Sequence, residues 1–312
     1  MGADWPGEAD EPAEGDSSPD ASRSGGGRRV PAETRSRQEY YDELHSTVSA
    51  TARQNAAEEQ AAAEKWDEAA EESRWMWTEY ERKWPPDERP PVDTSADPPG
   101  SWRADGDRFL PAATNKRVDA ECDRVASRER DQISPAMRAV ESQNADRQLI
   151  GFERCLKGRD RIKEKVCDKI KEYGFSPEEA VSSVSDTIRY TFQYRDVRYA
   201  QGVQADIDRL KGRGFVLHKL KNYWFGEEYK GINSQWLEPA TGQRFEVQFH
   251  TRVSFEAKQL THDAYERLRT KQADRFEELV LEAFQAKVVA QVPIPPGAVG
   301  IPDCLQRSLD VR

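Results

Sequence analysis

Two short runs of alternating apolar and polar residues constrain the fold of this 312-residue chain more than any other feature. They are TIRYTFQY at residues 187–194 and QRFEVQFHT at residues 243–251. Successive side chains of a β-strand point to opposite faces, so each run predicts a strand with one apolar, buried face and one polar face. Helical patterns alternate with such runs from residue 149 onward, which is the rhythm of an α/β or α+β domain.

Other elements of this region follow from periodicity and from turn residues. An amphipathic pattern at residues 203–210 predicts a helix that ends at Gly212 and Gly214. Further strands are expected at 215–223 and 232–237, and further helices at 115–148, 254–270 and 273–289.

The first hundred residues differ in charge from the rest of the chain. Residues 1–100 carry 11 Lys and Arg against 24 Asp and Glu, whereas residues 151–270 carry 22 against 18. A phosphate-rich ligand is therefore expected in the later, mildly basic segment. We divide the chain into a disordered acidic tail (1–36), a helical region (37–85), a Pro-rich linker (86–110), a domain of helices and strands (111–290) and a C-terminal tail (291–312).

Within the helical region, Trp77, Tyr80 and Trp84 recur at helical spacing and form an aromatic stripe. Such a stripe usually packs against another helix of the same protein, and the alternative is a docking face for a partner protein. No apolar run approaches the roughly 20 residues that span a bilayer, and the first residues lack the layout of a signal peptide. A cytoplasmic protein without a membrane partner is expected, with delivery by a specialised export system as an open alternative.

The polar faces of the two runs carry groups that suit phosphate and metal chemistry. Asp186 and Arg189 lie at the start of the first strand, and Glu246, Gln248 and His250 lie on the polar face of the second. Mg²⁺ prefers oxygen ligands and takes one or two protein carboxylates together with substrate phosphates, so the two carboxylates are candidate ligands. Upstream, KGRDRIKEKVCDKIK concentrates Lys and Arg in a short stretch of helix, a density that can neutralise a triphosphate.

Taken in order, these segments resemble the synthetase domain of the RelA/SpoT family. The resemblance depends on LKGRDRIKEKVCDKI, a D-x-x-R strand, YKGINSQW, RFEVQFHT and a following THDAYE, and it covers roughly residues 149–270. It implies a nucleotidyltransferase-like α+β fold, with a mixed β-sheet flanked by helices. It also implies that the β,γ-pyrophosphate of ATP is transferred to the 3′-hydroxyl of an acceptor nucleotide, with AMP released and Mg²⁺ as the cofactor. The products of that reaction are alarmones of the (p)ppGpp or (p)ppApp type.

The same resemblance assigns roles to individual residues. Asp186, Arg189 and Glu246 are implied to be catalytic, with Asp186 and Glu246 as metal ligands and Glu246 alternatively as the general base. The residues implied to bind ATP are Arg159, Arg161, Lys163 and Lys169. The residues implied to bind the acceptor are Lys221, Tyr229, Lys230, Gly231, Asn233, Gln248 and His250.

Three departures from the family pattern leave the acceptor open. Ile232 stands where a tyrosine commonly stacks on guanine, Trp236 replaces a usual His, and His250 replaces a usual Arg. The acceptor is therefore GDP or GTP, an adenine nucleotide, or the 3′ end of an RNA such as tRNA. Trp224, Phe225 or Trp236 could supply a stacking ring instead, and the alternative for these aromatic residues is core packing.

The hydrolase domain of the family's long members uses several His and Asp metal ligands, and His45 is the only histidine before residue 218. A synthetase-only enzyme is therefore expected, either an alarmone synthetase or a toxin. Such an enzyme cannot reverse its own product, so it needs a restraining partner such as an antitoxin or a separate hydrolase. The competing hypothesis is an interaction protein of the same fold that binds nucleotide without catalysis.

Overall fold

The structure of the protein is a computed structural model that describes residues 37–85, 92–270 and 273–305. The expected acidic tail lies outside these residues, as do parts of the expected linker and of the expected C-terminal tail. The chain separates into two units, residues 1–51 and residues 52–312. The described part of the first unit is the beginning of helix α1 (Arg37–Lys83), which confirms the predicted helical region.

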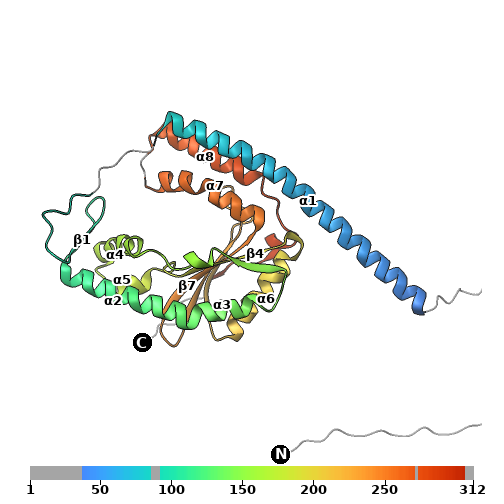
Figure 1. Cartoon of the computed structure of the whole chain (residues 1–312), viewed down its shortest axis with the longest axis horizontal. Helices are drawn as coiled ribbons and strands as arrows, with labels where there is room; N and C mark the ends of the chain where they lie inside the picture. Colours follow the sequence, from blue (N-terminus) through green and yellow to red (C-terminus); the bar gives the residue numbers. More distant parts are fainter. Residues whose placement is uncertain (1–36, 86–91, 271–272, 306–312) are drawn as a thin grey trace, which may run out of the picture. The chain divides into compact units, whose positions relative to one another are not determined.

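A six-stranded mixed sheet organises the second unit (Figure 1). Its strands, in spatial order, are β3 (Arg147–Ile150), β4 (Arg189–Tyr194), β7 (Gln243–Thr251), β6 (Ile232–Glu238), β5 (Val216–Asn222) and β8 (Cys304–Leu305). Strands β4 and β7 are parallel, and the other neighbouring pairs are antiparallel. The predicted α+β fold with a mixed sheet is confirmed, and the ends of the four predicted strands shift by at most two residues.

Helices surround this sheet. They are α2 (Ala112–Arg128), α3 (Ser134–Glu141), α4 (Arg159–Tyr173), α5 (Pro177–Ser183), α6 (Tyr199–Gly212), α7 (Arg252–Arg269) and α8 (Arg275–Ala290). The region expected to be helical at 115–148 is divided: a π-helical turn (Glu129–Ile133) joins α2 to α3, and the last residues enter strand β3. Strand β3 was not predicted, because four residues at a sheet edge carry too little alternation to be recognised.

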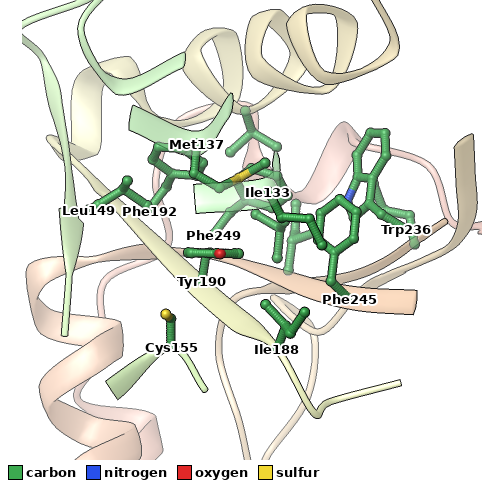
Figure 2. Close-up of a cluster of buried hydrophobic side chains, with 14 of the residues drawn as sticks. Ile133, Met137, Leu149, Cys155, Ile188, Tyr190, Phe192, Trp236, Phe245 and Phe249 are labelled. Carbon is green, nitrogen blue, oxygen red and sulfur yellow. The ribbon is translucent and has the colours of Figure 1, made fainter. Parts of the chain in front are cut away.

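The apolar face of the sheet forms the core. Tyr190, Phe192 and Phe245 are each at most 1% exposed. Figure 2 shows these rings gathered with Ile133 and Met137, which come from the π-helical turn and from α3. Helix α6 adds four more buried residues to the same core: Tyr199, Val203, Ile207 and Leu210. Alternation along the strands therefore leaves the other face polar.

Helix α7 covers the polar face, and α8 and the C-terminal part of α1 pack behind it (Figure 1). The indole Nε1 of Trp66 donates to Glu256 Oε2 of α7 at 2.6 Å, and the ring of Trp77 lies 5.4 Å from that of Phe284 in α8. The Tyr80 hydroxyl donates to the buried carboxylate of Glu277. The interpretation that the aromatic stripe packs on another helix of the same chain is thus confirmed.

Two segments outside the expected domain core are ordered into strands. Residues 92–110 of the expected linker include the hairpin of β1 (Trp102–Arg103) and β2 (Phe109–Leu110), and β8 adds a strand to the sheet next to β5. The proposed domain boundaries themselves stay a prediction. Within the described ranges, no helix combines the length and the apolar character needed to cross a bilayer.

Candidate functional site

The register of the central strands aligns polar residues in rows on one face of the sheet. Arg189 of β4 lies opposite Glu246 of β7, and Glu246 lies opposite Gln235 of β6. In the next row, Gln248 of β7 lies opposite Asn233 of β6. Residues opposite each other in a ladder share a face, so the expected grouping of Arg189 and Glu246 on neighbouring strands is present.

Glu246 is desolvated and hydrogen-bonded. The side-chain amide Nε2 of Gln248 donates to Glu246 Oε1, and Lys258 Nζ of α7 donates to Gln248 Oε1 at 2.5 Å. Burial raises the pKa of Glu246, and the amide of Gln248 and the charges of Arg189 and Lys258 offset only part of that effect. Burial also lowers the pKa of Lys258, to about 8, with a further contribution from Arg189. The carboxylate is therefore a stronger base than one in water.

Asp186 lies just before β4 and is held by two lysines. Lys157 Nζ lies 2.6 Å from Oδ2, and Lys165 Nζ lies 2.8 Å from both carboxylate oxygens. Burial alone would raise the pKa of Asp186, but the hydrogen bonds and charges of the two lysines outweigh burial and lower it. The carboxylate is thus ionised at neutral pH, and a metal ion bound there would take the place of lysine contacts.

Asp186 and Glu246 remain the two candidate carboxylates for a magnesium ion. The charge of Asp186 contributes to the raised pKa of Glu246, so the two groups lie within electrostatic reach of each other. A divalent cation relieves the repulsion between two such carboxylates. In the described ranges, no set of three or more His, Cys, Asp and Glu side chains could hold a metal ion. Water and substrate phosphates would therefore supply the remaining ligands.

Helix α4 divides the basic segment between two directions. Arg159 binds the carboxylate of Asp123 and lies 3.6 Å from Asp119 of α2, which also accepts from Lys163 at 2.8 Å. Arg161 comes two residues after Arg159, and Lys165 comes two residues after Lys163. Two residues of an α-helix turn by about 200°, so each later side chain lies on the other side of the helix. Lys165 points to Asp186, as described. Of the remaining predicted ATP ligands, Arg161 pairs with Glu164 at 3.1 Å and Lys169 Nζ lies 4.7 Å from the ring centre of Tyr173.

Five of the seven predicted acceptor residues come together at the β6–β7 end of the polar face. The Tyr229 hydroxyl lies 2.7 Å from both Asn233 Oδ1 and His250 Nε2. Since a hydroxyl has one proton, it donates to the amide oxygen and accepts from the imidazole. The His250 ring also meets Ser254 Oγ through Nδ1 at 2.9 Å. Burial holds the pKa of His250 well below its usual value, so this histidine is neutral.

Gly231 lies against this histidine. Its φ is +145°, and a Cβ atom on Gly231 would lie 2.8 Å from His250 Cε1, so the position favours glycine. The two predicted lysines of the acceptor segment are engaged elsewhere. Lys221 pairs with Asp303 at 3.0 Å, and Lys230 Nζ donates to the carbonyl of Trp224 at 2.9 Å.

Comparisons with known proteins give matches at the level of structure. No protein-family model matches the sequence, and no curated protein matches it significantly. Among solved structures, the chain is similar to the small alarmone synthetase 1 from Bacillus subtilis, at 15% identity and a TM-score of 0.38, over 56% of this chain and 89% of that one. The same synthetase bound to its product pppGpp matches at 16% identity and a TM-score of 0.40, over 56% of this chain and 90% of that one. A GTP pyrophosphokinase family protein from Streptococcus pneumoniae matches at 13% identity and a TM-score of 0.40, over 58% of this chain and 90% of that one.

At these identities and TM-scores, neither residue roles nor substrates are transferred to this chain. The function of this chain is therefore inferred from its own residues.

Burial decides between base stacking and core packing for the aromatic residues proposed on the acceptor side. Ile232 and Trp236 are fully buried on the apolar face, and Figure 2 shows Trp236 beside Phe245. Both residues alternate with Asn233, so they point away from the polar rows. Trp224 is fully buried as well, and its ring meets Tyr199 of α6. Core packing, the alternative, is correct for the two tryptophans.

Among the proposed stacking residues, Phe225 remains accessible, with 73% exposure. Sequence reasoning missed a second candidate ring: Tyr223 is 39% exposed and lies edge-on to Tyr229, with ring centres 5.4 Å apart. It also missed Lys258, the residue of α7 that contacts Gln248. The sequence signal that could have identified Lys258 is its short separation from β7 along the chain. A helix that starts at the end of a strand can run back over that strand, so residues in its first turns can contact the strand.

Proposed function

We propose that this chain is an ATP-dependent nucleotide pyrophosphokinase, which transfers the β,γ-pyrophosphate of ATP to the 3′-hydroxyl of an acceptor and releases AMP. The observation that supports it most is the desolvated carboxylate of Glu246 beside the cation of Arg189 on one face of the sheet, with two lysines on Asp186. A carboxylate of raised pKa suits proton abstraction, and neighbouring cations suit an anionic substrate. The order of the sequence motifs supports the same reaction class.

In this reaction the 3′-oxygen of the acceptor forms a bond to the β-phosphorus of ATP, and the bond from that phosphorus to the α,β-bridging oxygen breaks. Glu246 accepts the proton of the hydroxyl group. Arg189 and the lysines beside Asp186 stabilise the charge on the transferred diphosphate and on the leaving AMP. Asp186 would hold Mg²⁺, with Glu246 as a second ligand in the alternative to its role as base, and the ion would supply further neutralisation of the phosphate oxygens.

The acceptor side supports a nucleotide without selecting its base. Tyr229, Asn233 and Gln248 offer hydrogen-bonding groups, and Phe225 offers an exposed ring on which a base can stack. Guanine nucleotides, adenine nucleotides and the 3′ end of an RNA are all acceptors of this chemical class. A restraining partner, either an antitoxin or a separate alarmone hydrolase, and a cytoplasmic site of action belong to the same proposal.

The test is release of AMP. The purified protein is incubated with α-labelled ATP and Mg²⁺, together with GDP, GTP, ADP or tRNA in separate reactions. We expect AMP and a diphosphorylated acceptor in at least one reaction, and neither when EDTA is present. Turnover with none of these acceptors, in a folded protein that binds ATP, would contradict the proposal.

The second candidate is a nucleotide-binding protein without catalysis. Two ion-paired clusters favour it: Asp186 is held by two lysines, and Arg159 binds carboxylates of α2. Such a protein would bind ATP in calorimetry and release no AMP. Release of AMP, measured on the same sample that binds ATP, therefore distinguishes the two candidates.

A further inference from the structure

We propose that Lys258 is a positioning residue, which orients the carboxylate of Glu246 through the side-chain amide of Gln248. This inference rests on the pyrophosphokinase function proposed above, because it takes Glu246 as the group that meets the acceptor hydroxyl. Neither the ordered motifs nor the resemblance assigns a role to Lys258.

The chemistry of the three groups fixes their order. A lysine ammonium carries only donors, so the Gln248 atom at 2.5 Å from Nζ must be the amide oxygen. The amide nitrogen then points the other way, and it donates to Glu246 Oε1. Without a donor on its oxygen, the amide of Gln248 could turn over and present that oxygen to the carboxylate. Lys258 therefore decides which end of the amide Glu246 meets.

The start of α7 places Lys258 in this position. Thr251 caps the helix, and Ser254 completes a reciprocal capping box, so the first turn of α7 is fixed to the end of β7. Four residues of helix advance about 6 Å, and two residues of strand advance about 6.6 Å. Ser254 can therefore contact His250, and Lys258, one turn further along the helix, can contact Gln248; both contacts are present.

Two contacts hold α7 in place from behind. Trp66 of α1 donates to Glu256, two residues before Lys258. Arg267 near the end of α7 pairs with the buried Glu277 of α8 at 2.5 Å, and Tyr80 donates to the same carboxylate. The lysine is thus delivered to Gln248 by a helix anchored at both ends, which is what a positioning role requires.

The test compares Lys258→Met, which keeps the length of the side chain and removes the donor, with Lys258→Arg, which restores a donor-only cation. We expect kcat for AMP release to fall about 10- to 100-fold in Lys258→Met, the usual loss when a group supporting a catalytic residue is removed. KM for ATP should stay within about twofold, because the contacts of α4 are untouched, and Lys258→Arg should recover part of kcat. Lys211→Met, an exposed lysine of α6, is the matched control and should behave like wild type.

A double-mutant cycle with Gln248→Leu decides whether Lys258 acts through the glutamine. If it does, Lys258→Met costs little further activity once Gln248 is replaced. Additive losses, or a rise in KM with kcat unchanged, would overturn the proposal and indicate direct contact with substrate. If Gln248→Leu does not fold, the comparison of Lys258→Met with Lys258→Arg decides, and equal losses in both variants would overturn it.

A readout without turnover separates this inference from the proposed function. The side-chain amide signals of Gln248 in an NMR spectrum, identified by their loss in a Gln248 variant, should broaden or shift in Lys258→Met and stay in place in Lys211→Met. If wild type releases no AMP and these signals still respond, the proposed function fails while the contact stands. If the signals do not respond, the positioning role fails, whatever the activity.

Discussion

Replacing Glu246 by glutamine should separate activity from stability, because the substitution should lower turnover without lowering the melting temperature. The substitution keeps the shape of the side chain and removes its charge. Loss of a general base or of a metal ligand of this kind lowers the rate about 10²- to 10⁴-fold, which corresponds to about 3–5 kcal/mol of barrier. Turnover, measured as magnesium-dependent AMP release, should therefore fall by that factor.

The stability of the same variant should stay constant or increase. Burial raises the pKa of Glu246 in the folded state. A carboxyl group of raised pKa stabilises the fold below its unfolded pKa, and this contribution is lost as the pH rises through the folded pKa. At pH 7.5 the ionised group is disfavoured in the folded chain relative to the unfolded chain, so its removal does not lower the melting temperature.

Glu238→Gln is the matched control, because the structure predicts the reverse result. Hydrogen bonds from Thr241 and Ala240 hold the pKa of Glu238 low, although burial opposes them. Its ionised form therefore stabilises the fold at neutral pH. The control should lose about 2–4 °C in melting temperature, from a loss of about 1 kcal/mol, and keep its turnover. Full turnover in Glu246→Gln, or a clear loss of its stability, would refute the assignment of Glu246.

Three further outcomes follow from the structure. Phe225→Ala should weaken binding of the acceptor by about 1–3 kcal/mol and leave ATP binding unchanged in calorimetry, whereas equal losses for both ligands would remove the ring from the acceptor site. Arg159→Ala should weaken ATP binding about tenfold. Asp123→Asn frees Arg159 from its exposed ion pair and should strengthen ATP binding by at most about fivefold, whereas weaker ATP binding in this variant would contradict the role of Arg159. Burial and the nearby charge of Glu59 raise the pKa of Asp196 to about 6, so its stabilising contribution is present at acidic pH and lost as the pH rises through about 6. Asp196→Asn should therefore raise the melting temperature at pH 7.5 and change it little at pH 4, and a uniform change at both values would rule out this titration.

The sequence determined which residues share a face, because alternation in a strand is a local property. The pattern of β7 separated Glu246 and Gln248 from Phe245 and Val247 without knowledge of any neighbour. The same rule also applies to β6, where it assigns Ile232 and Trp236 to the core. The alternative that Trp236 stacks on an acceptor base was therefore excluded for a reason that the sequence already contained.

The tertiary structure decided which side chains meet, because those contacts join segments that are far apart in the chain. The basic residues of α4 form one cluster in the sequence, but Arg159 faces α2 and Lys165 faces Asp186, since the helix has different neighbours on its two sides. Strand β3 owes its conformation to pairing with β4, and its own four residues do not specify it. Lys258 is one of many lysines in the sequence, and it becomes the partner of Gln248 through the anchoring of α7 by α1 and α8. Local periodicity fixes the face on which a side chain lies, and long-range packing fixes what it touches there.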